Sequence, residues 1–397
     1  MMLGWCGGIR KWCCGAVSMH HALAWAHIRG RGRGKTKTLS ISLAPDYCEI
    51  QTPIVLQPGC MVLALVTGGT GFIGSHLVET LAQRGVTVRC LVRSPDRARL
   101  LRECGAELVV GDLDRPDSLD RAMEGVGVVY HLAGCTKSLT EAEMFRVNDA
   151  GCTSVAQACA EQAQPPRLVV VSSIAASGPT ANGRLRVEGD APAPISIYGR
   201  SKLAGELAAA RHSARVPTTI VRPGIVFGPR DPAFAKLFRT IRLLRFHPSP
   251  GLSPPPLSYI HVADLIEILL RAADQGLRLP AHENGSPGLG RYFAVMDEYP
   301  SYAELGRLVR PMLSRPFAPV IPLASPLAWC VAGVSEVVGH LRGRPEDLRF
   351  DKLREALAGS WACSAAAVER DLGFSPPKPL ADRLQETIDW YAREGWL

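Results

Sequence analysis

Signals of several protein classes are missing from this chain of 397 residues. The seven cysteines after residue 60 are scattered and none forms a CxxC pair, which argues against a disulfide framework and predicts no metal site. Pro322, Pro326 and Glu336 interrupt the apolar segment 320–338, which argues against a membrane-spanning helix. Residues 1–60 hold seven Lys/Arg and two Asp/Glu, so they carry most of the formal net charge of +8. The remainder is only weakly basic, and we expect no nucleic-acid partner.

What is present is an ordinary globular composition preceded by an atypical segment. Hydrophobic residues are 47% and charged residues 21% of the chain, enough to bury a sizeable core. Residues 1–60 contain five of the 12 cysteines and a basic run from Arg29 to Lys37, without a sustained helix or strand period. Because Met61 directly precedes an apolar strand, we expect residues 1–60 to be a disordered extension or an incorrectly placed translation start. The basic run makes a transit peptide and a short nucleic-acid tail the alternatives. A secretory signal is not among them, because a good secretory hydrophobic region is absent.

Three glycines lie between an apolar strand and an apolar pattern of helical period. Thr67 ends the strand, and Gly68, Gly71 and Gly74 follow it. Glycine accepts the backbone angles of a tight turn, lets a pyrophosphate approach the main chain, and lets the helix pack close to the sheet. The helix N-terminus then offers unpaired N–H groups to the phosphates. The stretch predicts a dinucleotide-binding turn, and an ordinary strand–turn–helix corner is the alternative.

The second predicted strand, 86–92, ends in Arg93. An Asp or Glu at this position often bonds the adenosine ribose of NAD, whereas a guanidinium pairs with the 2′-phosphate of NADP. The position therefore favours NADP over NAD as the cofactor. A solvated surface arginine is the alternative interpretation.

The ends of other strands predict where the rest of a dinucleotide lies. Asp112 and Leu113 follow the third strand, where the Asp112 carboxylate is placed to accept a hydrogen bond from an adenine amino group. Ala133 follows the fourth strand and leaves room for the cofactor. Pro223 follows the sixth strand and fixes the loop where a nicotinamide ring would lie. His131, at the end of the fourth strand, is interpreted as a structural residue.

A tyrosine and a lysine four residues apart predict the chemistry. Tyr198 and Lys202 share one face of a helix. An ammonium beside a phenol lowers the tyrosine pKa from its reference of about 10, which suits a general acid/base. Ser173, at the carboxyl end of the strand 168–171, is placed to hold a substrate oxygen against Tyr198. Asn148, in a helix over 141–161, is expected to order the active-site backbone, with a surface amide as the alternative.

The remaining segments predict a second, smaller lobe. We expect a helix over 116–123 with Asp114 as its cap, an apolar helix over 233–246, and a proline-rich loop or lid over 247–257. Beyond residue 280 the alternation of strands and helices weakens. Segment 320–338 is expected to lie on a membrane surface, to cover the pocket, or to form a plain core helix. The tract 364–393 predicts two helices.

Together these residues resemble the extended short-chain dehydrogenase/reductase family, within the NAD-dependent epimerase/dehydratase superfamily. The stretch from Thr67 to Gly74, with Phe72 and Ile73, is similar to its cofactor fingerprint, and Asp112-Leu113 to its adenine contact. The resemblance covers residues 61–397. It implies that Ser173, Tyr198 and Lys202 form a catalytic triad, with Lys202 also holding the nicotinamide ribose.

Within the family the chain most resembles the 3β-hydroxysteroid dehydrogenase/isomerase branch. Ser172-Ser173-Ile174 followed by Gly178-Pro179, and the stretch Val368 to Phe374, carry this resemblance. Ser173-Ile174 stands where sugar-nucleotide 4,6-dehydratases have an Asp-Glu pair, which argues against that reaction. Ser177 stands where many nucleotide-sugar epimerases have a tyrosine, which makes an epimerase the less favoured interpretation.

The sequence thus predicts an α/β fold with a Rossmann-type doubly wound parallel sheet over 61–250. A smaller, mostly substrate-binding lobe over 251–397 would be joined by loop 179–195 and helix 233–246. The expected activity is NAD(P)-dependent oxidation or reduction of a hydrophobic, sterol- or flavonol-like substrate. A nucleotide-sugar epimerase and a non-catalytic cofactor-binding regulator are the alternatives. We expect a cytoplasmic protein, with a membrane surface and a second copy of the chain as further candidate partners.

Overall fold

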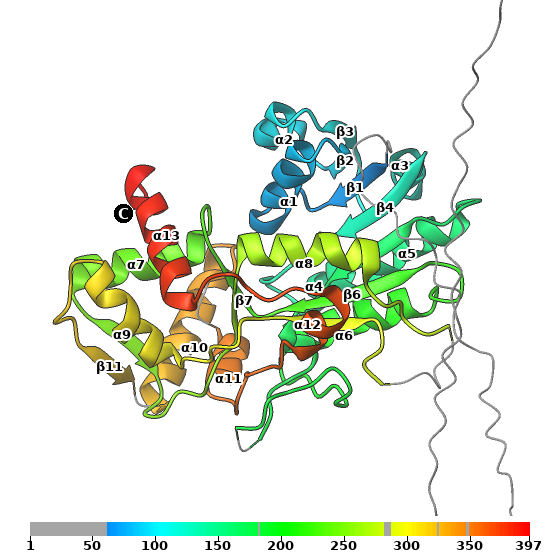
Figure 1. Cartoon of the computed structure of the whole chain (residues 1–397). Helices are drawn as coiled ribbons and strands as arrows, with labels where there is room; N and C mark the ends of the chain where they lie inside the picture. Colours follow the sequence, from blue (N-terminus) through cyan, green and yellow to red (C-terminus); the bar gives the residue numbers. More distant parts are fainter. Residues whose placement is uncertain (1–61, 182, 282–286, 324, 347–348) are drawn as a thin grey trace, which may run out of the picture. The chain divides into compact units, whose positions relative to one another are not determined.

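The computed structural model describes residues 62–181, 183–281, 287–323, 325–346 and 349–397, so the predictions for residues 1–60 lie outside the described residues. Seven strands form its central sheet (Figure 1), and every neighbouring pair is parallel. Their spatial order is β10 (Arg291–Ala294), β6 (Thr218–Pro223), β5 (Arg167–Val171), β4 (Val126–His131), β1 (Leu63–Thr67), β2 (Thr87–Val92) and β3 (Glu107–Val110). The order reverses between β1 and β4, and open α/β sheets bind ligands at such a switch point. The predicted Rossmann-type sheet is confirmed.

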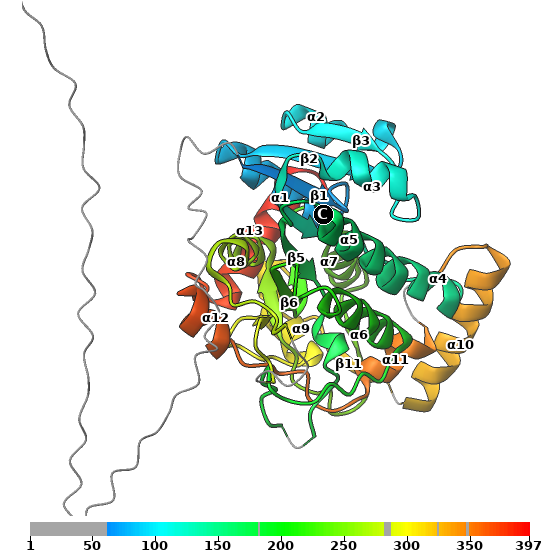
Figure 2. The same cartoon turned by 90° about the vertical axis from the view of Figure 1, so that its right-hand side faces the viewer.

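Helices cover both faces of this sheet (Figure 2). The layers consist of α1 (Phe72–Gln83), α2 (Arg99–Glu103), α8 (Val262–Gln275) and α12 (Ala366–Leu372) on one side, and of α3 (Pro116–Met123), α5 (Gly151–Glu161) and α6 (Ile197–Ala210) on the other. Strand β1 shows why. Ala64 and Val66 belong to the apolar cluster that contains Leu77 of α1, whereas Leu65 belongs to the cluster that contains Val155 of α5. Side chains alternate along a strand, so an unbroken apolar strand serves two cores.

The helical stretch predicted over 141–161 is present but is not uniform. It begins as α4 (Glu141–Phe145), continues as a π-helical turn over Arg146–Ala150 and ends as α5. Helix α3 also matches its prediction, but its cap does not. Arg115 occupies the N-cap position, and the Asp114 carboxylate instead forms an ion pair with Arg146.

The later part of the chain adds short sheets and helices beside the main sheet. These elements are β7 (Ile225–Phe227), α7 (Pro232–Leu244), β8 (His247–Pro250), β9 (Tyr259–His261), α9 (Tyr302–Met312), β11 (Val320–Leu323), α10 (Ser325–Leu341), α11 (Phe350–Ala356) and α13 (Leu380–Arg393). Strand β7 pairs with β9, and β8 pairs with β11. Loop 179–195 joins this region through isolated bridges from Thr180 to Ser360 and from Arg186 to Cys363. The division of the chain at residue 250 stays a prediction.

One expectation for this region was wrong in part, and one of the three alternatives for segment 320–338 is excluded, while its place on a membrane surface or over the pocket stays a prediction. The proline-rich segment 247–257 is not entirely a loop, because its first four residues form β8. The segment 320–338 is not a plain core helix, because it starts as a strand and because Val331, Val334 and Val337 of α10 are exposed. No helix in the described ranges is long and apolar enough to cross a membrane.

Candidate active site

The glycine turn has the geometry that the sequence predicts. Gly68 has a φ of +75°, and a Cβ added there would lie 2.6 Å from the backbone nitrogen of Ala133. A Cβ on Gly74 would lie 2.2 Å from the carbonyl oxygen of Gly68. Gly71 is the N-cap of α1, and its N–H donates to the Gly68 carbonyl at 3.0 Å. The turn therefore needs glycine at its first and third positions and leaves the start of α1 open.

The end of β1 is joined to the end of β4 across the switch point. The Thr67 hydroxyl is hydrogen-bonded to Nδ1 of His131 at 2.8 Å and accepts the N–H of Ala133 at 3.3 Å. Burial, followed by the charge of Lys202, lowers the pKa of His131 to about 3. A neutral, buried, paired imidazole is structural, so the prediction for His131 is confirmed.

A cavity of about 370 Å³ adjoins the glycine turn and fits an anionic ligand. Its wall includes Gly71 and Phe72 at the start of α1, together with the side chains of Arg97 and Arg230. Arg230 pairs with Glu79 at 2.8 Å, yet its buried Nε has no hydrogen-bond partner within the described ranges. Two guanidinium groups beside a helix N-terminus and a glycine cradle suit the pyrophosphate of a dinucleotide. Neither Ser173 nor Tyr198 lines this cavity, so it covers only the part of the candidate site beside the glycine turn.

The other predicted cofactor residues lie at or near strand ends. Arg93 directly follows β2, is exposed, and lies near enough to Cys135 to influence the pKa of that thiol. The Asp112 carboxylate follows β3 and accepts the N–H of Leu113 at 2.7 Å. Pro223 is the buried last residue of β6. Ile73, the second residue of α1, packs against the core cluster below the turn.

The structure brings Ser173 and Tyr198 together at the carboxyl end of β5. The Ser173 hydroxyl caps the short 3₁₀ turn Ile174–Ala176 by accepting the N–H of Ala175 at 3.1 Å. Tyr198 is the second residue of α6. Burial raises the pKa of Tyr198 above its ordinary value, and a hydrogen bond with the Ser173 side chain opposes this shift. A phenol and a hydroxyl facing one another at this point form a pair able to bind and protonate a carbonyl oxygen.

Lys202 lies one helical turn further along α6, but its interaction differs from the expected one. Its buried ammonium donates to the carbonyl oxygen of Val171 at 2.7 Å. The groups that shift the pKa of Tyr198 after burial and Ser173 are Lys352, Glu355 and Cys135. Burial dominates here and raises the pKa of Tyr198, so the action of Lys202 on the phenol stays a prediction.

Asn148 orders the backbone beside this site, as one of the two interpretations predicted. Its side chain is 2% exposed, its Oδ1 accepts the N–H of Cys135 at 2.7 Å, and its Nδ2 donates to the Cys135 carbonyl at 2.8 Å. Nδ2 also donates to the Ser201 hydroxyl at 2.9 Å. The π-helical turn holds this amide, and such turns occur frequently at functional sites.

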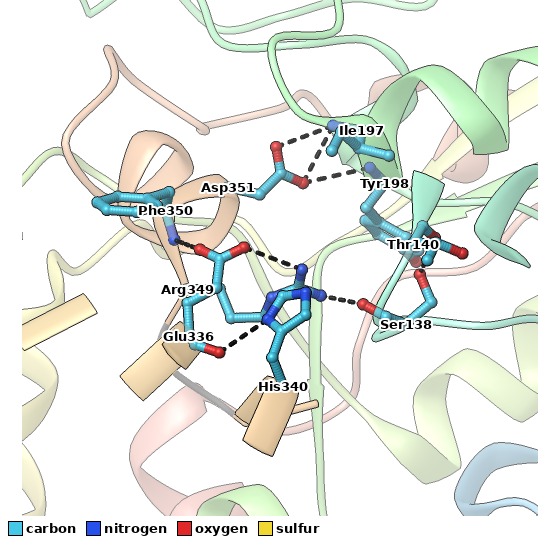
Figure 3. A network of polar contacts seen from close by, with 9 residues as sticks. All are labelled: Ser138, Thr140, Ile197, Tyr198, Glu336, His340, Arg349, Phe350 and Asp351. Carbon is cyan, nitrogen blue, oxygen red and sulfur yellow. Dashed lines mark hydrogen bonds and ion pairs between the residues drawn. The ribbon is translucent and has the colours of Figure 1, made fainter. Parts of the chain in front are cut away.

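Two groups of site residues were missed by sequence reasoning. The first is a buried ion pair between Glu206 of α6 and Arg222 of β6. The Glu206 carboxylate of this pair also accepts the Ser172 hydroxyl. The second is a set of residues on and just before α11, which contact the start of α6 (Figure 3). Neither group has a local signal, because its members lie 16 to 159 residues apart in the chain.

The chain is similar to a protein family and to several known proteins. The model of the "NAD dependent epimerase/dehydratase family" matches residues 64–283. The chain is 32% identical over 334 residues to ceramide reductase of Caulobacter vibrioides, covering 84% of this chain and 95% of that protein. It is 30% identical over 340 residues to sterol demethylase protein B of Methylococcus capsulatus, covering 84% and 99%. The structure of MoeE5 in complex with UDP-glucose and NAD superposes with a TM-score of 0.62 at 25% identity, covering 83% of this chain and 99% of that one.

Proposed function

The chain belongs to the NAD-dependent epimerase/dehydratase family, and we propose that it is a dehydrogenase or reductase of a lipophilic alcohol or ketone, with Tyr198 as the acid/base. The observation that carries this proposal is the meeting of Ser173 and Tyr198 at the carboxyl end of β5, the strand next to the switch point between β1 and β4. When bound, the nicotinamide dinucleotide supplies or accepts the hydride. The glycine turn and Arg230 are the groups that would hold its phosphates.

The chain's own residues handle the proton. In the reducing direction, the Ser173 hydroxyl donates a hydrogen bond to the substrate carbonyl oxygen, and the Tyr198 phenol gives its proton to that oxygen as negative charge develops there. In the oxidising direction, the Tyr198 phenolate takes the proton of the substrate hydroxyl. Lys202 and Asn148 keep the surrounding backbone in place through Val171 and Cys135.

The proposal of a lipophilic substrate is supported by the names of relatives and not by the lining of a pocket. The names of two relatives contain ceramide and sterol, both lipids. Phe234 and Phe238 are buried, and Phe238 packs against Tyr391 of α13. Helix α7 does not present its apolar residues to one pocket, because Ile241 is also in the core whereas Leu243 and Leu244 are exposed.

Replacement of the tyrosine tests the proposal. We expect Tyr198→Phe to lose about 10²- to 10⁴-fold in kcat, because it removes the proton donor and leaves the glycine turn intact. Oxidation of the reduced nicotinamide is followed by absorbance with sterol and long-chain ketones, and nucleotide affinity is measured separately. Tyr292→Phe is the matched control. This tyrosine lies on the edge strand β10, and its hydroxyl accepts the N–H of Leu277, which follows α8. Full activity in Tyr198→Phe, or no turnover by the wild type with any ketone or alcohol, would contradict the proposal.

For the cofactor we propose NADP. The exposed Arg93 stands at the end of β2, where the adenosine ribose of a bound dinucleotide lies. Arg93→Asp should weaken NADPH binding by about 10- to 100-fold, because a charged hydrogen bond of about 1.5–3 kcal/mol becomes a repulsion, and should leave NADH binding equal or tighter. Titration calorimetry with both nucleotides measures this. Arg121→Asp, an exposed change of equal charge on α3, is the control, and an unaltered preference in Arg93→Asp would refute the assignment.

An epimerase acting on a nucleotide sugar remains the second candidate. MoeE5 is described with UDP-glucose and NAD, and the unpaired Nε of Arg230 suits a diphosphate. Arg239, a second arginine that could serve a diphosphate, instead donates to the carbonyl of Trp396. Conversion of UDP-glucose into an epimer without net change of the cofactor would favour this candidate over a reductase.

A further inference from the structure

The first turn of α6, the helix that carries Tyr198, is held from outside the helix. Asp351 of α11 accepts the N–H of Ile197 with both carboxylate oxygens, at 2.9 and 3.0 Å, and the N–H of Tyr198 at 3.4 Å (Figure 3). The first N–H groups of a helix have no partner within it, and a carboxylate there also suits the helix dipole. The backbone of the tyrosine is therefore bound by a residue 153 positions later in the sequence.

A second carboxylate of α11 supports the same turn through the N-cap of α6. Ser196 caps the helix by accepting the N–H of Gly199 at 2.9 Å. Its hydroxyl donates in turn to the buried Glu355 at 2.5 Å, which fixes the oxygen in its capping position. Two carboxylates one helical turn apart on α11 therefore support the start of α6, Asp351 directly and Glu355 through Ser196.

Helix α11 is itself attached to two other parts of the fold. Arg349, its N-cap residue, donates to the carbonyl oxygen of Ser138 in the loop after β4 and pairs with Glu336 of α10 at 3.2 Å (Figure 3). Leu353 is 1% exposed and lies in a small apolar cluster with two alanines of α10. These attachments limit the movement of Asp351 relative to the catalytic helix.

The start of α6 packs closely against the turn that Ser173 caps. A Cβ added to Gly199 would lie 2.3 Å from the carbonyl oxygen of Ala175, in the short 3₁₀ turn that follows Ser173. The two backbones therefore touch directly beside the hydrogen bond between the Tyr198 and Ser173 side chains. Because Ser173 is fixed by the end of β5, the alignment of the pair depends on where the first turn of α6 lies.

We propose that Asp351 is a positioning residue of this site, which holds the first turn of α6 so that the Tyr198 phenol stays within hydrogen-bonding reach of Ser173. Asp351 acts through the N–H groups of Ile197 and Tyr198 and takes no part in proton transfer. The inference rests on the proposed function of Tyr198 as the acid/base. A carboxylate that only stabilised the helix would change the free energy of unfolding and leave the kcat of the folded protein as it is.

The first test separates kcat from nucleotide affinity in Asp351→Asn. The amide keeps the size of the side chain, but it loses the charge and turns one acceptor oxygen into a donor that faces the N–H groups of α6. We expect kcat to fall about 10- to 100-fold, since a misplacement of about 1 Å can cost that much, while nucleotide affinity stays at its wild-type value. Asp351→Glu keeps the carboxylate and should lose less.

The matched control is Asp382→Asn, the same change at an exposed acid in the first turn of α13, which should keep the wild-type kcat. A wild-type kcat in folded Asp351→Asn, or an equal loss in Asp382→Asn, would overturn the inference. If Asp351→Asn does not fold, Asp351→Ser carries the same comparison, since its hydroxyl still accepts one N–H group.

The second test needs no substrate, so a failure of the proposed function does not affect it. The [13Cζ]-tyrosine resonance of Tyr198 is assigned with Tyr198→Phe, and Ser173→Ala shows where it lies without the serine hydroxyl. In Asp351→Asn the resonance should move towards that position, and in Asp382→Asn it should not move. An unchanged resonance in folded Asp351→Asn would show that the carboxylate does not position the phenol.

Discussion

Removal of one partner from the buried ion pair behind the active site should be among the most destabilising single substitutions in the fold. Arg222 of β6 and Glu206 of α6 are each 1% exposed. They share two hydrogen bonds, from Nε at 2.8 Å and from Nη2 at 2.6 Å. The carboxylate also accepts the Ser172 hydroxyl at 2.5 Å, and the guanidinium donates to Ser177 at 2.9 Å. The two charged groups therefore satisfy one another and two serine hydroxyls at the contact between α6 and β6.

Arg222→Met keeps the volume of the aliphatic stem and removes the cation. The Glu206 carboxylate is then left buried without its main partner, and breaking such a pair costs about 3–5 kcal/mol. At the middle of this range the ratio of folded to unfolded protein falls about a thousandfold. Because Glu206 positions Ser172, the neighbour of Ser173, we also expect a lower kcat in whatever fraction stays folded.

Equilibrium unfolding in urea, followed by tryptophan fluorescence, measures the loss. The double variant Glu206→Met with Arg222→Met separates charge from packing. With both charges gone it should recover most of the loss, apart from about 1–3 kcal/mol for each serine hydroxyl left without a partner. Arg121→Met on α3 is the exposed control. A cost below about 1 kcal/mol in Arg222→Met, or a double variant less stable than the single one, would refute the reasoning.

The same pair predicts how stability depends on pH. Burial raises the pKa of Glu206, but Arg222 and the hydrogen bonds outweigh it, so the pKa lies below the ordinary value. A carboxylate with a depressed folded-state pKa adds stability above its unfolded pKa of about 4.3, and this stability is lost as pH falls through the lower folded value. Between neutral pH and pH 3 the free energy of unfolding of the wild type should therefore fall more than that of the double variant.

Two further substitutions test the glycine turn and the amide beside it. Gly74→Ala places a Cβ 2.2 Å from the carbonyl oxygen of Gly68, so the turn must move. We therefore expect no measurable NADPH or NADH binding by calorimetry. Wild-type affinity would show that the glycine turn is not the nucleotide site. Asn148→Ala leaves the N–H and the carbonyl of Cys135 without their partner, which should cost about 1–3 kcal/mol for each group in urea unfolding; a change below about 0.5 kcal/mol would mean that water replaces the amide.

The parts of this protein that sequence reasoning predicted are those encoded within about twenty consecutive residues. The turn over Gly68 to Gly74 carries its own explanation, since a strand, three glycines and a helix leave few other structures. Tyr198 and Lys202 belong together through the helical period alone. Their mutual electrostatics were not predictable in the same way, because the position of the lysine ammonium depends on the carbonyl of Val171, which no spacing reveals.

What the sequence did not reveal comes from contacts between distant segments. The stretch Arg349–Glu355 reads as an ordinary charged surface helix, with alternating acids and bases. In the folded chain Asp351 and Glu355 contact the start of α6, because that end offers N–H groups with no partner in the helix and the Ser196 hydroxyl as a donor.

This difference suggests where the specificity of the site is set. The β-strand ends and the glycine turn, which many members of the fold share, fix where a nucleotide and a tyrosine lie. The carboxylates that hold the start of α6 come from α11, in the part of the chain whose strand–helix pattern is weakest. A change in α11 can therefore alter the placement of Tyr198 without touching the glycine turn. Kinetics and calorimetry of Asp351→Asn and Arg93→Asp separate the two, since only the first should lower kcat at unchanged nucleotide affinity and only the second should change the nucleotide preference.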